Sequence, residues 1–145
     1  VLLEPTALYT APLPELLAAH PGAVHALSPV TGGGIAANLA RVLPVGSWVE
    51  LDRGTWSPPA VFRVLSDMAG DPLESAEGTW NLGIGMLAVV EGGRADAVIE
   101  HLGSLGEVVW QVGTVSTSAR ELAGFEQGAK GVDGGAVRLV GSYAD

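Results

Sequence analysis

The sequence contains no cysteine, which excludes disulfide bonds, thiolate metal sites and cysteine nucleophiles. Lysine is nearly absent too, because Lys130 is the single lysine among seven Lys and Arg residues. These seven cations stand against sixteen Asp and Glu residues, which gives a net charge of −9. Such a chain repels a nucleic-acid backbone overall and offers no polybasic patch for a membrane surface. We therefore expect neither nucleic acid nor a membrane as a partner.

Long hydrophobic runs are missing as well. The longest apolar stretch, residues 82–90, is interrupted by Gly83 and Gly85 and is too short to span a bilayer. The first residues show neither the basic segment nor the apolar core of a signal peptide. Together with the lack of cysteine, this predicts a cytoplasmic protein. Because the chain opens with the apolar Val1 and no Met, we expect it to be a piece of a longer polypeptide.

What the sequence does contain is enough apolar material for a core. Its 145 residues are 48% hydrophobic and 16% charged, which argues against disorder. This length is typical of one domain, and such a domain buries roughly two-thirds of its unfolded surface on folding. We therefore predict a single domain over residues 1–145, folded without help from a metal.

Glycines and prolines divide the chain into alternating helical and extended pieces. This alternation predicts an α/β (α+β) domain with a mixed sheet. Residues 116–135 show no clear period, so we expect a surface loop there. The patterns predict helices over residues 12–20, 33–43, 57–68 and 94–105, with a helical turn over 72–77 and an N-cap at Thr31. They predict strands over residues 23–27, 47–51, 82–90, 108–115 and 136–140.

The sharpest local motif is the run Thr31, Gly32, Gly33 and Gly34, between a predicted strand and a predicted helix. Three adjacent glycines leave no β-carbon to keep a ligand from the backbone, and the first turn of a helix presents unpaired N–H groups. This is the arrangement that binds a phosphate. A tight strand-to-helix turn would need the same glycines, so both interpretations stay open.

A second motif begins at Asn81, where Gly83 and Gly85 alternate with apolar residues. Glycine at alternate positions strips one face of a strand, which suits the close approach of a ligand or another backbone. Asn81 could donate and accept hydrogen bonds at the edge of such a site. The alternative is a bulged strand against a helix, with Asn81 in a turn.

Other polar residues give weaker signals. The spacing of His20, His25 and His101 does not match that of metal ligands, so we predict no metal site. Glu74 and Glu77 lie three residues apart, which is typical of a solvated helix face. No pattern identifies a catalytic residue.

Taken together, the segments resemble the carboxy-terminal half of aminoimidazole ribonucleotide synthetase, also called phosphoribosylformylglycinamidine cyclo-ligase. The resemblance covers nearly the whole chain except about residues 117–135. The residues that carry it are Leu3–Thr6, Tyr9, Val30–Gly34, Asn38, Leu39, Arg41–Pro44, Asp52, Arg53, Trp56, Val61, Phe62, Asn81, Gly83, Gly85, Met86, Trp110, Gly113, Val140 and Gly141.

This resemblance implies a three-layer α/β/α domain that binds the ribonucleotide substrate. It implies that ATP and Mg²⁺ are bound mainly by an amino-terminal domain absent from this chain, and that the parent enzyme is a homodimer. The parent would close the imidazole ring of formylglycinamidine ribonucleotide with ATP, while the isolated domain would be inactive. The residues implied to bind substrate are Thr31, Gly32, Gly33, Gly34, Asn81, Gly83 and Gly85.

Two positions depart from the family pattern. Ala7 stands where these enzymes usually carry Arg, and Pro29 stands where they usually carry His. Both lost side chains are polar groups that suit a phosphate ligand. The departures therefore favour an alternative: a non-catalytic module that keeps the glycine turn for a phosphate ligand but has lost catalysis.

Overall fold

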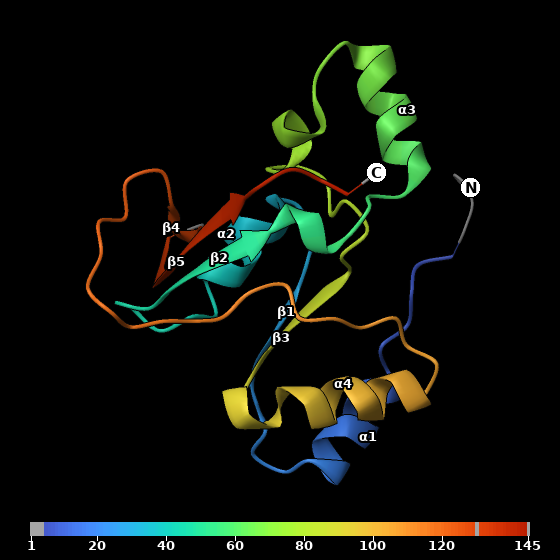
Figure 1. Ribbon diagram of the computed structural model, residues 1–145, viewed down its shortest axis with the longest axis vertical. Helices are drawn as coiled ribbons and strands as arrows, with labels where there is room; N and C mark the ends of the chain where they lie inside the picture. The colour runs from blue at the N-terminus through green and yellow to red at the C-terminus, as the bar shows by residue number, and fades with distance from the viewer. Residues whose placement is uncertain (1–4, 130, 145) are drawn as a thin grey trace. The chain divides into compact units, whose positions relative to one another are not determined.

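The computed structural model describes residues 5–129 and 131–144, and Figure 1 traces them from blue to red. The predictions that involve Leu3, Glu4 and Lys130 lie outside these residues. The described chain divides into two compact units. Unit 1 comprises residues 5–27 and 88–111, and unit 2 comprises residues 28–87 and 112–144.

Unit 1 is built on two helices, α1 (Pro12–Ala19) and α4 (Ala95–Ser104), which pack against each other (Figure 1). Pro12 favours the first turn of α1, since proline lacks the N–H that remains unpaired there. The buried Val98 and Leu102 are four residues apart on α4, so they lie on one face of it. With Leu16 and Ala23 they form the core of this unit.

Two strands, β1 (Val24–Pro29) and β3 (Met86–Val90), pair in a two-stranded sheet. The chain passes between the two units within each of these strands and again after Gln111. In unit 1 the pairing is extended by the N–H of Glu91, which donates to the Ala23 carbonyl at 2.9 Å.

Unit 2 contains a three-stranded mixed sheet in the order β2 (Trp48–Asp52), β5 (Val132–Val140), β4 (Glu126–Ala129). The central strand β5 runs parallel to β2 and antiparallel to β4. The helix α2 (Gly34–Ala40) packs on β4 and β5. It comes so close that a β-carbon at Gly134 would collide with the Ala40 carbonyl oxygen, which explains a glycine in the middle of β5.

The rest of unit 2 is α3 (Ala60–Ala69) and three-residue to four-residue 3₁₀ turns, η1 (Arg53–Thr55) and η2 (Leu73–Ala76). A further turn, η3 (Gly92–Arg94), precedes α4 in unit 1. The helix α3 begins after Pro58 and Pro59 and ends at Gly70, whose φ of 73° is typical of a glycine C-cap. Within the described residues, no helix has the length and apolarity needed to cross a bilayer.

The predicted class, mixed α/β with a mixed sheet, is confirmed. The strand predicted over residues 108–115 is wrong, because this stretch forms no strand and Gly113 makes an isolated bridge with Leu51. The loop predicted over residues 116–135 is wrong in part, since it contains β4 and the start of β5. The strand predicted over residues 136–140 is the second half of β5. Strand β4 escaped prediction because Glu126–Ala129 has no apolar period; its pairing with β5 rests on backbone hydrogen bonds around an irregularity at Gly128.

Candidate functional site

The turn Thr31–Gly34 joins β1 to α2 in unit 2. Gly33 and Gly34 have φ angles of 109° and 70°, a left-handed backbone that glycine adopts without strain. The predicted N-cap at Thr31 is wrong, because Gly33 occupies the N-cap position and the seven-residue helix α2 begins at Gly34. Thr31 serves the turn through its carbonyl instead, which accepts from the Gly34 N–H at 3.1 Å.

The side chain that holds this turn is Asn38, which is 1% exposed. Its Nδ2 donates to the carbonyl oxygens of Gly34, at 2.6 Å, and Thr31, at 3.1 Å. Its Oδ1 accepts from the Thr31 hydroxyl and from Arg41. A buried amide pays for its desolvation only when it is hydrogen-bonded, so Asn38 fixes the turn in one conformation. Sequence analysis did not assign Asn38 to the site, although a polar residue on the apolar face of a short helix was a usable signal.

Packing explains one of the three glycines directly. A β-carbon at Gly34 would collide with the backbone carbonyl oxygen of Glu77. At Gly32, in contrast, a β-carbon would meet nothing within 4 Å, and the residue is exposed. The tight-turn interpretation therefore accounts for Gly33 and Gly34, whereas packing gives no reason for glycine at position 32.

The second motif is also a turn. The Asn81 side-chain Oδ1 accepts from the Gly83 N–H at 3.2 Å, and its carbonyl accepts from the Ile84 N–H at 2.9 Å. The strand predicted from residue 82 is wrong at its start, since β3 begins at Met86 and the buried Leu82 has a φ of 48°. Asn81 lies in a turn, as the alternative held, but the bulged strand of that alternative does not include residues 82–85. Gly83 is required here, because a β-carbon would press on the Pro59 ring and its φ is 95°.

The structure brings the two motifs together within unit 2. The Val30 N–H, directly before Thr31, donates to the Gly85 carbonyl at 3.0 Å. At the other end of the first motif, Gly34 contacts Glu77, four residues before Asn81. The seven residues expected to bind substrate therefore belong to two adjoining turns of one unit.

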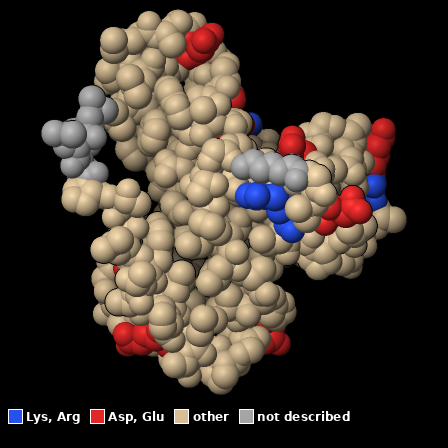
Figure 2. Space-filling view, turned by 180° about the vertical axis from the view of Figure 1, so that it is seen from behind, with Lys and Arg blue, Asp and Glu red and all other residues tan. Residues whose placement is uncertain are grey.

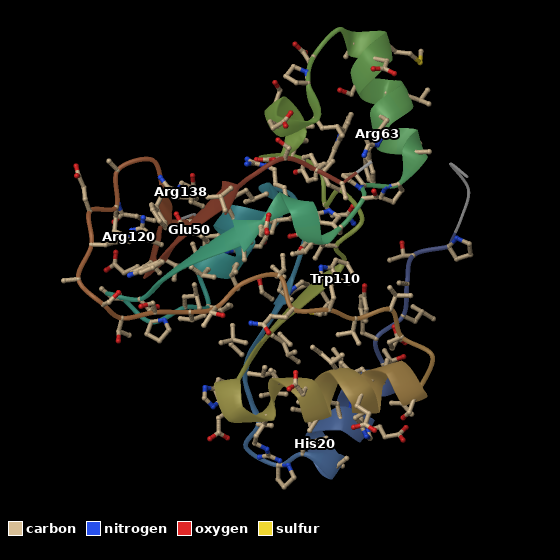
Figure 3. The ribbon with its side chains drawn as sticks, in the orientation of Figure 1. His20, Glu50, Arg63, Trp110, Arg120 and Arg138 are labelled. Atoms are coloured by element: carbon tan, nitrogen blue, oxygen red, sulfur yellow. The ribbon has the colours of Figure 1, made fainter. Side chains whose placement is uncertain are left out.

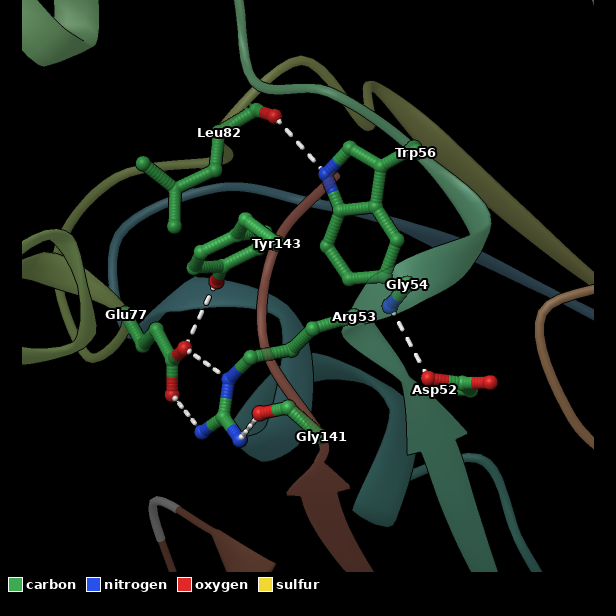
Figure 4. A network of polar contacts seen from close by, with 8 residues as sticks. All are labelled: Asp52, Arg53, Gly54, Trp56, Glu77, Leu82, Gly141 and Tyr143. Atoms are coloured by element: carbon green, nitrogen blue, oxygen red, sulfur yellow. Dashed lines mark hydrogen bonds and ion pairs between the residues drawn. The ribbon is translucent and has the colours of Figure 1, made fainter. Parts of the chain in front are cut away.

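Next to these turns lies a network of polar contacts around Glu77 (Figure 4). Arg53 donates to both carboxylate oxygens of Glu77, from Nε at 2.6 Å and from Nη2 at 2.8 Å. Arg53 also donates to the Gly141 carbonyl at 3.1 Å, and the Tyr143 hydroxyl donates to Glu77 at 2.6 Å. The side chains of Arg53 and Glu77 are 14% and 16% exposed. The prediction that Glu77 lies on a solvated face is wrong.

The network shifts the ionisation of two of its members. Burial, and secondly the hydrogen bond to Glu77, raise the pKa of Tyr143, while Arg53 opposes this. The hydrogen bond to Glu77 raises the pKa of Arg53. Glu77 is thus satisfied by a bidentate guanidinium and a phenol, a strong and directional arrangement. Its effect is to fix the backbone of residue 77, which is the backbone that contacts Gly34.

Unit 2 also has a cavity of about 660 Å³ beside Tyr143, and none of the seven predicted substrate residues lines it. Its polar lining mixes one arginine with three carboxylates, and Arg63, labelled in Figure 3, donates to the Ala144 carbonyl. The lining residues are Arg63, Ser66, Asp67, Gly70, Asp71, Pro72, Leu73, Glu74, Ser142 and Tyr143.

A second charged cluster lies on the sheet of unit 2, where Glu50 pairs with Arg120 and Arg138 (Figure 3). The Arg120 guanidinium lies 4.4 Å from the centre of the Trp48 ring, and that of Arg138 lies 4.6 Å from the Phe125 ring. The hydrogen bond from Arg138 lowers the pKa of Glu50. The cluster stabilises the sheet through these ion pairs and cation–π contacts, with two guanidinium groups for one carboxylate. Among the described residues, the buried Nε of Arg138 has no hydrogen-bond partner.

Comparison with known proteins identifies the family to which the chain belongs. Residues 1–123 match the family described as AIR synthase related protein, C-terminal domain. The chain is 49% identical over 116 residues to phosphoribosylformylglycinamidine cyclo-ligase of Sorangium cellulosum (strain So ce56), a match of 79% of this chain and 33% of that protein. It is 34% identical over 123 residues to the cyclo-ligase of Aromatoleum aromaticum (strain DSM 19018 / LMG 30748 / EbN1), or 85% of this chain and 35% of that protein.

A Streptomyces fradiae relative, named provisionally as the same cyclo-ligase, is 38% identical over 143 residues, which are 99% of this chain and 72% of that protein. The mixed α/β fold and these matches define a domain related to a ligase. The chain belongs to the AIR synthase related family, as its C-terminal domain. It spans about a third of the length of the Sorangium and Aromatoleum relatives.

Proposed function

We propose that this chain is the substrate-binding part of a cyclo-ligase that converts formylglycinamidine ribonucleotide and ATP to aminoimidazole ribonucleotide, ADP and phosphate. The observation that carries the proposal is the family match over residues 1–123 together with relatives that bear the cyclo-ligase name. The meeting of the Thr31–Gly34 and Asn81–Gly85 turns in one unit supports it, because it gives the expected substrate residues a common location.

Within this site the residues have separate tasks. The turn Thr31–Gly34 holds the 5′-phosphate of the substrate at its exposed end, and Gly32 is the position where the ligand approaches the backbone. Asn81, Gly83 and Gly85 form the adjoining wall. Support comes from the exposure of Gly32 and from the Asn38 hydrogen bonds, which fix the turn before any ligand arrives. A preformed site binds more tightly, because ordering it costs nothing at the moment of binding.

The binding sites for Mg²⁺ and ATP lie mainly outside this chain. Among the described residues no three His, Asp or Glu side chains are grouped so that they could hold a metal ion. The described residues therefore do not fit a magnesium site. ATP and Mg²⁺ bind mainly to the amino-terminal domain of the same polypeptide, which is the first partner of this chain.

In the reaction, ATP phosphorylates the formyl oxygen of the substrate and leaves as ADP. A substrate nitrogen, which becomes part of the ring, then attacks the formyl carbon, and phosphate leaves as the imidazole closes. The contribution of this chain is positional: it anchors the phosphate end so that the formyl group stays oriented toward ATP. Holding reactants in the right geometry accounts for several kcal/mol of a typical enzymatic barrier. The complete enzyme acts as a homodimer in the cytoplasm.

The alternative function is a non-catalytic module that binds a phosphate ligand. It is favoured by Ala7 and Pro29, which are exposed and lack the Arg and His usual in the family. Both functions use the Thr31–Gly34 turn, so ligand binding alone does not distinguish them.

Three samples test the proposal: this chain, the separately produced remainder of the polypeptide, and their mixture. ATP-dependent ring closure is measured in each. We expect the two parts to be inactive alone and the mixture to recover turnover. Turnover by this chain alone would contradict the division of the site, and an inert mixture of folded, associated parts would favour the binding module.

A further inference from the structure

The helix α3 carries an apolar stripe that unit 2 leaves largely uncovered, with only Val61 of its four residues partly buried. Val61, Val64, Leu65 and Met68 are spaced three and four residues apart, so they share one face of the helix. Val64 is 55% exposed, Leu65 37% and Met68 80%. An amphipathic helix of a globular protein normally buries such a face, so the exposure of the stripe needs an explanation.

The opposite side of α3 is the one that anchors the helix. Ser66 is its one buried residue and donates to the Asp71 carbonyl, and Arg63 donates to the Ala144 carbonyl. The Phe62 ring lies 5.5 Å from the ring of Trp80. The helix α3 also packs against η2. The helix is therefore held by its more polar side, and the apolar stripe faces away from its own unit.

We infer that this stripe, defined as Val61, Val64, Leu65 and Met68, is the docking surface for an apolar face on the part of the longer polypeptide that lies outside residues 1–145. The inference rests on the proposed function, which makes this chain one part of a larger cyclo-ligase. The length of two relatives supports it, because the chain spans 33% of the Sorangium protein and 35% of the Aromatoleum protein.

Two arguments favour a covalently linked occupant over a second copy. A stable interface between separate proteins uses about 20–30 residues on each side, whereas the stripe offers four. A tethered segment needs no such area, since linkage holds it at a high effective concentration.

Charge gives the second argument. Each copy carries a net charge of −9, and exposed carboxylates of Asp67 and Asp71 border this end of α3. Two copies that met at this helix would bring like charges together, which is unfavourable. The occupant is therefore an apolar face with basic residues at its rim. Large uncharged areas are common on the face shown in Figure 2. Lack of charge alone therefore does not identify a docking surface, and the inference for α3 rests on the helical spacing of its exposed apolar residues.

The test uses the full-length polypeptide and the absence of native cysteine in this chain. One variant carries Met68→Cys, and a matched control carries Val45→Cys, because Val45 is 73% exposed but lies outside the stripe. Alkylation rates at the two thiols are measured by mass spectrometry in the native protein and normalised to the unfolded protein. A photoreactive maleimide attached to the thiol at position 68 then identifies what lies against it.

We expect the thiol at position 68 to react at least about tenfold more slowly than the thiol at position 45, because protection scales with the free energy of opening. We expect its crosslinks to reach residues outside this chain's 145. Equal rates at the two positions would overturn the inference. Crosslinks to residues 1–145 of a second molecule, seen as a product of twice the mass, would also overturn it. This experiment does not measure ring closure. A protein that lacks the proposed activity can therefore still show protection and crosslinks at position 68, and the two failures are distinguishable.

Discussion

The backbone carbonyl oxygen of Glu77 lies against Gly34, in the place that the β-carbon of any other residue would occupy. The carboxylate of the same glutamate binds Arg53 and Tyr143. One residue thus joins the glycine turn to the polar network of unit 2. The glycine motif is therefore part of the packing of this unit, and only its exposed end remains for a ligand.

This contact predicts that Gly34→Ala destabilises the protein. A residue other than glycine in a left-handed backbone costs about 1–3 kcal/mol, and the collision with Glu77 adds to this. We expect a loss of at least about 2 kcal/mol in the free energy of unfolding, measured by urea unfolding followed through tryptophan fluorescence. The matched control is Gly32→Ala, where a β-carbon meets nothing. Equal stability of the two variants would contradict the packing role of Gly34.

The network around Glu77 predicts a second loss of stability. Glu77→Gln keeps the shape of the side chain but leaves the largely buried Arg53 without a counter-charge. Removing one partner of a buried pair costs about 3–5 kcal/mol, and residual exposure lowers this to about 2 kcal/mol. Glu74→Gln, on an exposed neighbour, is the control and changes stability by less than about 0.5 kcal/mol. Similar melting temperatures for both variants would show that the network contributes no stability.

The raised pKa of Tyr143 predicts a dependence of stability on pH. The unfolded chain releases the phenol proton near pH 10, whereas the folded chain holds it to higher pH because of burial and Glu77. This contribution to stability is complete below pH 10 and disappears as the pH rises through the folded pKa. In a Tyr9→Phe background, we expect unfolding free energy to fall more steeply above pH 10 than in the Tyr9→Phe, Tyr143→Phe double variant.

The same Tyr9→Phe protein allows a direct reading, because Tyr143 is then its sole tyrosine. Absorbance at 295 nm reports tyrosinate. We expect it to rise only above the pH at which a model tyrosine titrates, or together with unfolding. Titration of the folded protein at the ordinary value would mean that Tyr143 is neither buried nor bonded to Glu77 in solution.

Position 32 separates ligand binding from folding. Gly32→Val places a side chain on the exposed part of the turn without a clash in the structure, so we expect an unchanged melting temperature. We expect it to weaken inorganic phosphate binding by about tenfold or more, because the backbone is no longer approachable. The measurement is the shift of the Gly33 and Gly34 amide resonances on phosphate titration. Unchanged affinity would show that the turn has a structural role only.

Sequence patterns predicted the elements whose side chains repeat with a regular period. The helices α1, α3 and α4 lie within about three residues of the predicted bounds, since apolar residues and prolines mark their faces and ends. Strand β4 was missed because its residues, Glu126–Ala129, are held by backbone pairing. Residues 108–115 were predicted as a strand because most of them favour extended backbone. Such a local pattern gives no information on whether a neighbouring strand is in register to pair with it.

The candidate site was predicted in the same partial way. The glycine turn could be found because three adjacent glycines are rare in a helix-starting position. The roles of Glu77 and Tyr143 could not be found, because they lie 66 residues apart and meet only in the fold. Gly34 illustrates the limit most clearly: the sequence shows the glycine, but the reason for it is a carbonyl 43 positions further along, at Glu77.

We propose that residues 1–145 serve catalysis of ring closure and do not merely bind a phosphate compound. The most direct test is the full-length polypeptide incubated with formylglycinamidine ribonucleotide and Mg-ATP, with product aminoimidazole ribonucleotide and ADP quantified together. We predict stoichiometric formation of both products, and a loss of at least about tenfold in kcat/KM for Gly32→Val. Binding of the ribonucleotide without any product, in a folded protein that also binds ATP, would contradict this account and establish the binding module.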